Sequence, residues 1–214
     1  MNICALFDMD GVLIDTEPQY SIFWKGIASK YNIQVKNFEN KVKGMTIPHI
    51  TDFYFNVLLD EEVEQILNDF RKFEEAVLFP DIPGAIDFVK KLKLHNIKVG
   101  LVTSATELKL NRVCQQKQFD TLFDVIVSAK DIENGKPAPD CFLLAAKKLN
   151  ADPKSCIVFE DSLAGIAAGN EAKMIVVGLA TTHPEQALKD QCVQVIPDFD
   201  HITVDQLKYI VSNI

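Results

Sequence analysis

The sequence predicts an α/β fold in which a doubly wound parallel sheet carries a small inserted α-helical domain. Short apolar segments recur along the chain, a helical pattern follows most of them, and one long helical stretch interrupts the alternation. The composition is typical of a globular protein, since 48% of the 214 residues are hydrophobic and 24% are charged. A chain of this length buries enough surface to fold without disulfide or metal support.

Short segments rich in valine and isoleucine are predicted as strands, at residues 2–7, 97–102, 124–128, 156–159 and 174–178. They are apolar without clean alternation, as expected of strands that are buried on both faces. Segments with apolar residues at helical spacing lie between them, at residues 82–94, 107–118, 139–149 and 163–171. This order predicts βαβ units and a sheet covered by helices on both sides.

One stretch, between the first two predicted strands, is far longer than a single crossover helix requires. Its pattern is helical from Glu17 to about Leu78, and proline and glycine mark turns at residues 15–18 and 79–84. We therefore predict two domains, a core formed by residues 1–15 and 80–214, and a helical cap formed by residues 16–79. The name "cap" is used for residues 16–79 below.

Composition and charge restrict the possible partners. The net charge of −8 argues against nucleic acid and anionic membranes as partners, and no apolar run approaches the roughly 20 residues of a membrane span. The five cysteines form no C-x-x-C pair, and the first residues lack a basic signal-peptide region. We expect a cytoplasmic protein with reduced thiols, a monomer or weak homodimer, that acts on a small metabolite.

Reactive side chains follow the predicted strands, where ligands of open parallel sheets bind. Asp8 and Asp10 follow the first strand, Ser104 the second, and Asp161 the fourth, while Lys136 lies downstream of the third. Because these strand ends share one edge of the sheet, we expect the acidic groups, the hydroxyl and the lysine to lie together.

Asp8 and Asp10 are two residues apart, so in an extended segment both side chains emerge on the same side. Crowded carboxylates need a cation or a shared proton, and hard oxygen ligands suit Mg²⁺. No histidine or cysteine adjoins them, which disfavours zinc. Taken alone, the same residues could simply end a strand and open a turn at Gly11.

Other positions also have an ordinary structural interpretation. Ser104 could be the N-cap of the helix that begins near Glu107, a role compatible with binding an anion at the helix N-terminus. Asp161 could cap the following helix in the same way. Lys136 alone could be a solvated surface lysine, although prolines stiffen the loop after it.

These residues, taken in order, resemble the motifs of the haloacid dehalogenase superfamily over essentially the whole chain. The segment 8–18, DMDGVLIDTEP, resembles the first motif, and Ser104, Lys136 in GKPAPD, and Glu160-Asp161 in FEDSLAGIAAG resemble the other three. The resemblance implies a Rossmann-like core with a small helical cap. Within the superfamily, the chain is similar to β-phosphoglucomutase and its sugar-phosphatase relatives.

The resemblance also implies roles for these residues. Asp8 would be the nucleophile and Asp10 the general acid and base. Mg²⁺ would be held by Asp8, the backbone carbonyl of Asp10, Asp161 and Glu160, and the phosphoryl oxygens by Ser104, the Ala105 amide and Lys136. In the cap, Thr16, Trp24 and Gly44 match residues that contact the substrate, although Trp24 could equally be a packed cap residue.

The function that this resemblance implies is Mg²⁺-dependent hydrolysis of a small phosphorylated sugar or polyol through a phospho-aspartate. A β-phosphoglucomutase-type mutase is the alternative. Tyr20 stands where the mutases have a cap histidine, and Ile47 stands where they have a loop arginine, which favours the phosphatase. A response-regulator receiver is disfavoured, because the third predicted strand ends in Ser128 and Ala129 without an acceptor aspartate.

Overall fold

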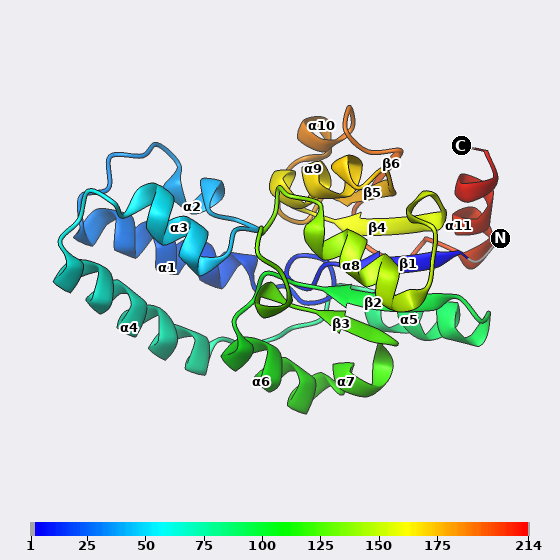
Figure 1. Cartoon of the computed structure of the whole chain (residues 1–214), viewed down its shortest axis with the longest axis horizontal. Helices are drawn as coiled ribbons and strands as arrows, with labels where there is room; N and C mark the ends of the chain where they lie inside the picture. The colour runs from blue at the N-terminus through cyan, green and yellow to red at the C-terminus, as the bar shows by residue number, and fades with distance from the viewer. Residues whose placement is uncertain (1–2, 214) are drawn as a thin grey trace.

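The computed structural model describes residues 3–213 and contains a sheet of six parallel strands in the order β3-β2-β1-β4-β5-β6 (Figure 1). The strands are β1 (Cys4–Phe7), β2 (Lys98–Val102), β3 (Val125–Val127), β4 (Cys156–Glu160), β5 (Ile175–Leu179) and β6 (Gln194–Ile196). The predicted α/β fold with a parallel sheet is therefore confirmed. β1 pairs with both β2 and β4, so the direction of the strand order reverses between β1 and β4. In sheets of this kind, ligands bind in the crevice at the carboxyl ends of the strands beside that reversal.

Two hydrophobic clusters cover the two faces of the sheet. Ala5 and Phe7 of β1 point into one cluster, while Cys4 and Leu6 point into the other. Both faces are apolar, which explains why the strands show no alternating pattern. The first cluster is covered by α5 (Ala85–Leu94), α6 (Glu107–Lys117), α7 (Phe119–Leu122) and α11 (Val204–Ser212), and the second by α8 (Asp140–Leu149), α9 (Leu163–Glu171) and α10 (Glu185–Leu188).

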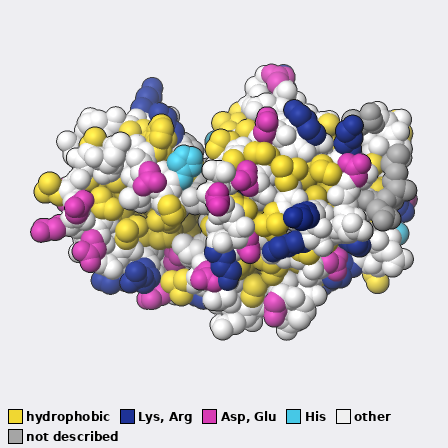
Figure 2. Space-filling view, in the orientation of Figure 1, with side chains coloured by type: hydrophobic (Ala, Val, Ile, Leu, Met, Phe, Trp, Pro, Cys, Tyr) yellow, Lys and Arg dark blue, Asp and Glu magenta, His cyan; other side chains and the backbone are white. Residues whose placement is uncertain are grey.

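The cap consists of α1 (Glu17–Lys30), α2 (Phe38–Lys41), α3 (Ile47–Tyr54) and α4 (Asp60–Ala76). Its apolar side chains form a third cluster around Trp24 and Phe70. The chain leaves and re-enters the core side by side, because Asp15 N donates to Pro80 O at 2.8 Å. The space-filling view shows an indentation between this lobe and the larger one (Figure 2). The boundaries at residues 16 and 79 stay a prediction.

Several elements differ from the sequence-based expectation. No element is predicted after Gly178, yet β6, α10 and α11 follow it; β6 is too short for a period to be visible, and of its three residues only Ile196 is buried. The predicted helix at 82–94 begins at Ala85, because Gly84 turns the chain with φ 71°. Asn2, the first residue of a predicted strand, lies outside the described residues. Within residues 3–213 there are also two short 3-10 helices, Ala129–Asp131 and Pro153–Ser155.

The structure gives all five cysteines as free thiols. Within residues 3–213, none of the helices has the length and apolar character that crossing a membrane requires.

Candidate active site

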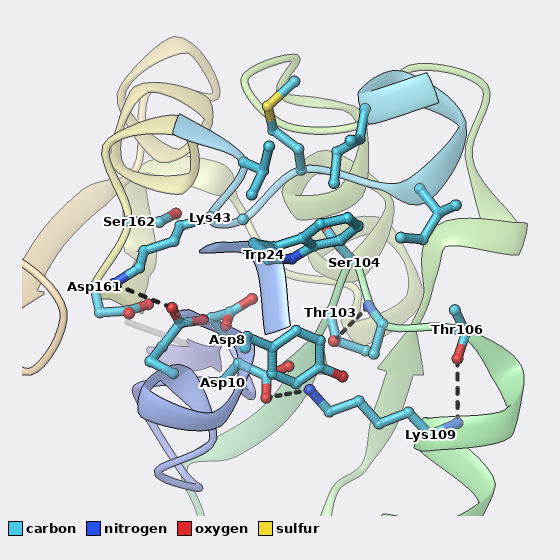
Figure 3. Close-up of a pocket in the computed structure, with 18 of the residues that line it drawn as sticks. Asp8, Asp10, Trp24, Lys43, Thr103, Ser104, Thr106, Lys109, Asp161 and Ser162 are labelled. Atoms are coloured by element: carbon cyan, nitrogen blue, oxygen red, sulfur yellow. Dashed lines mark hydrogen bonds and ion pairs between the residues drawn. The ribbon is translucent and has the colours of Figure 1, made fainter. Parts of the chain in front are cut away.

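A cavity of about 80 Å³ lies between the cap and the carboxyl edge of the sheet (Figure 3). Asp8, Asp10, Ser104, Ala105 and Asp161 all line it, although they come from three different strand ends. The cavity is small beside the roughly 300–1,000 Å³ of most ligand pockets. The cap therefore leaves little free space over the sheet edge.

Asp8 directly follows β1 and is buried, with its N–H donating to Phe159 O at 3.0 Å. Lys136, itself 1% exposed, donates through Nζ to Asp8 Oδ1 and to Glu160 Oε1, the latter at 2.7 Å. Burial raises the pKa of Asp8 to about 7, Lys136 opposes that rise, and the Glu160 and Asp10 carboxylates add to it. Burial tends to lower the pKa of Lys136, but Asp8 and Glu160 outweigh burial and raise it.

Glu160 ends β4 and engages both of its carboxylate oxygens within the protein. Oε1 accepts from Lys136, while Oε2 accepts from the backbone N–H groups of Asp161 and Ser162, at 2.9 and 2.8 Å, and from Ser162 Oγ. In this arrangement Glu160 fixes the position of the Lys136 ammonium behind Asp8.

Asp161 lines the cavity beside Asp8, as Figure 3 shows. The alternative interpretation, in which Asp161 caps α9, does not hold, because the N-cap is Ser162, whose Oγ accepts from Gly165 N at 3.0 Å. The Asp161 carboxylate is therefore directed to the cavity, and burial together with Glu160 and Asp8 raises its pKa well above the ordinary value. Gly11 permits this close approach, because a Cβ there would lie 2.0 Å from Asp161 Oδ2.

The donor set at this edge fits a divalent cation. Asp8, Glu160 and Asp161 are three buried carboxylates beside one lysine. Burial raises the pKa values of Asp8 and Asp161, and the neighbouring carboxylates add to both shifts. Hard carboxylate oxygens suit Mg²⁺. Within residues 3–213, no three His, Cys, Asp or Glu side chains are grouped closely enough to hold a metal by themselves. A cation here would therefore need additional ligands such as a backbone carbonyl.

Asp10 is held by two donors outside the Lys136 cluster. Its Oδ1 accepts from Thr16 Oγ1 and from Lys109 Nζ at 2.5 Å, the contact drawn in Figure 3. Thr16, predicted as a substrate contact, is completely buried, and its hydroxyl is bonded to Asp10. Lys109 was not predicted from the sequence, although it is only 2% exposed. The available signal was its helical spacing to Val113, which places a lysine on the buried face of α6.

The loop after β2 brings Ser104 and Ala105 to the cavity. Thr106 is the N-cap of α6 and accepts from Lys109 N at 3.2 Å, so the prediction of Ser104 as N-cap is wrong. The Ala105 N–H donates to Thr103 Oγ1 at 3.0 Å. Ser104 and the N-terminus of α6 therefore lie where an anion in the cavity could meet them.

The cap wall of the cavity is mainly apolar. Its lining side chains include Trp24, Val42, Met45, Ile47, Ile50 and Phe70. Trp24 is 4% exposed and stacks on Phe70 with ring centroids 5.4 Å apart, so it packs the cap and lines the cavity at once. Gly44 lies against the core, since a Cβ there would be 2.5 Å from Ser162 Oγ.

Comparison with protein families identifies one match, the model of the haloacid dehalogenase-like hydrolase, over residues 4–173. The bifunctional riboflavin kinase/FMN phosphatase of Arabidopsis thaliana is 29% identical over 201 residues, which cover 92% of this chain and 53% of that protein. The chain thus spans about half of this relative, and it spans 19% of another from the same plant.

Two further relatives match over most of both chains. The phosphorylated carbohydrates phosphatase of Thermotoga maritima is 30% identical over 176 residues, which cover 78% of this chain and 80% of that protein. The crystal structure of β-phosphoglucomutase from Clostridium difficile superimposes with a TM-score of 0.80 at 26% identity, covering 99% of this chain and 98% of that one.

Proposed function

This chain belongs to the haloacid dehalogenase-like hydrolase family, and on that premise we propose that it is a Mg²⁺-dependent phosphatase. Its substrate would be a small phosphorylated sugar or polyol, hydrolysed through a phospho-aspartate on Asp8. The observation that supports this most strongly is the cavity itself, where Asp8 and Asp10 face the Ser104 loop with Lys136 directly behind Asp8.

The proposed reaction has two steps. In the first, a carboxylate oxygen of Asp8 attacks phosphorus, the bond between phosphorus and the alcohol oxygen breaks, and Asp10 gives the alcohol its proton. In the second, water attacks phosphorus and passes a proton to Asp10, phosphate leaves, and the Asp8 carboxylate is restored. Splitting hydrolysis in this way lets one carboxyl group act first as acid and then as base.

The remaining residues would manage the charge of the phosphoryl group. Ser104, the Ala105 amide and Lys136 would hold its oxygens, and Glu160 would keep Lys136 in place. Asp8, Asp161 and the Asp10 carbonyl would hold Mg²⁺, which would supply positive charge to the phosphoryl group when bound. In this role Glu160 acts through Lys136, since both of its oxygens are engaged within the protein.

The character of the cap wall supports a phosphatase over a mutase. A mutase must bind the second phosphate of a bisphosphate intermediate on the cap side. Of the described cap residues that line the cavity, Lys43 alone is a cation, and its Nζ lies 3.4 Å from Glu17. The Tyr20 hydroxyl is also engaged, since it donates to Glu74 at 3.0 Å.

Phosphate release from a panel of sugar, polyol and nucleotide monophosphates tests this proposal. We expect release that stops with EDTA and returns with Mg²⁺, and indifference to the chelator would exclude the metal role. β-Glucose 1-phosphate with a bisphosphate primer belongs in the panel, because its isomerisation without phosphate release would show the mutase instead.

A further inference from the structure

We propose that Lys109 is a positioning residue for Asp10, one that holds this carboxylate through Oδ1 so that Oδ2 carries the proton given to the leaving alcohol. The inference rests on the proposed function, since it assigns a partner to the acid and base of that reaction. It concerns a residue on α6, a helix whose buried side chains Leu110 and Val113 pack against the core.

The contacts of Asp10 define which oxygen is available. Thr16 Oγ1 and Lys109 Nζ both donate to Oδ1, one from the start of the cap and one from α6. Two donors on the same oxygen fix the plane of the carboxylate, and a cationic donor favours negative charge on that oxygen. The proton transferred in the reaction then belongs on Oδ2.

Burying the lysine side chain at this position is energetically unfavourable unless its charge has a partner. Its side chain is 2% exposed, and desolvation would strongly disfavour a buried ammonium without a partner. An apolar residue would pack the same face of α6 at no such cost, as Leu110 and Val113 do. Packing alone therefore does not explain a lysine here, whereas the ion pair with Asp10 does.

The cap completes the environment of Lys109. The Tyr20 ring, from α1, lies over Nζ at 4.0 Å, and the Tyr20 hydroxyl donates to Glu74 Oε1 at 3.0 Å. Glu74 Oε2 accepts from Thr106 Oγ1, the N-cap that also accepts from the backbone N–H of Lys109. These contacts connect Tyr20 of α1 and Glu74 of α4 to α6, so residues of the cap complete the surroundings of Lys109, the partner of Asp10.

The dependence on the leaving group tests this role. An alkyl phosphate needs a proton on its leaving oxygen, whereas p-nitrophenyl phosphate does not. For Lys109→Met we expect phospho-enzyme formation in rapid-quench single turnovers to slow by about 100-fold with the best sugar or polyol phosphate, and by less than about 5-fold with p-nitrophenyl phosphate. Lys109→Arg should recover part of the loss with the alkyl substrate.

Lys117→Met is the matched control, because Lys117 lies on the same helix and pairs with Asp81 at 2.7 Å away from the cavity. It should leave both rates unchanged. Equal losses with both substrates in Lys109→Met would overturn the proposal. If that variant does not fold, Lys109→Gln replaces it, and failure of both to fold would assign Lys109 to stability alone. Full activity of Asp8→Asn would instead refute the proposed function, whatever Lys109 does.

Discussion

The two walls of the cavity differ in kind. The sheet edge is crowded with charge, since Asp8, Lys136 and Glu160 are joined by direct ion pairs and Asp161 lies beside them. The cap wall presents mostly carbon, from Trp24 and its apolar neighbours. Charged groups at the sheet edge can stabilise a phosphoryl group during its transfer. The apolar cap wall can only select substrates by the shape and surface of their leaving group.

Because of this contrast, we assign the phosphoryl chemistry to the sheet edge and the choice of substrate to the cap wall. Changes at Asp8, Lys136 and Glu160, which act on the phosphoryl group, should affect every substrate alike, because every substrate presents that same group. Changes in the cap wall should affect some substrates more than others.

The largest effect is expected at Asp8. Asp8→Asn removes the nucleophile but keeps the size of the side chain, so phosphate release should fall by at least about 10⁴-fold with every substrate of the panel. The far-ultraviolet circular dichroism should match the wild type. A loss confined to one substrate would break the division between the two walls.

Lys136→Met should reduce both activity and stability. The variant leaves Asp8 and Glu160 buried without their cation, so we expect phosphate release to fall by about 10²- to 10³-fold and the free energy of unfolding to fall by about 3–5 kcal/mol, measured by urea denaturation. Lys130→Met is the control, because Lys130 pairs with Glu107 on the exposed surface and its loss should change neither quantity much.

A smaller and more selective effect is expected in the cap wall. Ile47 lines the cavity, and Ile47→Ala should raise KM for the preferred substrate by about tenfold while leaving kcat for p-nitrophenyl phosphate nearly unchanged. Val57→Ala, at an 84% exposed position of the cap, should change neither parameter. A uniform fall of kcat in Ile47→Ala would show that the cap takes part in the chemistry.

The smallest effect is expected at the junction of the two walls. Burial raises the pKa of Glu74, with Thr106 and Lys109 opposing the rise. A raised carboxyl pKa favours the folded state at pH values below the ordinary glutamate pKa, and that contribution is lost as pH rises through the raised value. The stability of Glu74→Gln relative to wild type should therefore increase from about pH 4 to pH 7, as urea denaturation would show. A difference that is independent of pH would contradict this.

The sheet edge was predictable because its residues follow strands. Asp8, Ser104 and Asp161 each follow a recognisable apolar segment, and parallel strands bring their carboxyl ends together. Lys136 was predictable from the loop that holds it. The observed N-caps lie two residues after Ser104 and one residue after Asp161, and residue type does not separate these candidates because Ser, Thr and Asp all serve as N-caps.

The cap contacts were harder to predict, because they join segments that are distant along the chain. Lys109 and Asp10 are 99 positions apart in the sequence, and no motif around either residue indicates that they are in contact. Thr16 was expected at the substrate, yet its hydroxyl is bonded to Asp10. Side-chain direction within a packed interface depends on neighbours that a linear pattern does not contain.

Trapping the phospho-enzyme tests most directly whether Asp8 is the nucleophile. Asp10→Asn should slow the second step, while p-nitrophenyl phosphate still reacts in the first because its leaving group needs no proton. Rapid acid quench after mixing the variant with p-nitrophenyl phosphate and Mg²⁺ should therefore leave a phosphoryl group on the peptide that contains Asp8, detected by mass spectrometry. Loss of that label in the variant Asp8→Asn/Asp10→Asn would complete the assignment. A phosphoryl group on Ser104 instead of Asp8, or full turnover by Asp8→Asn, would contradict it.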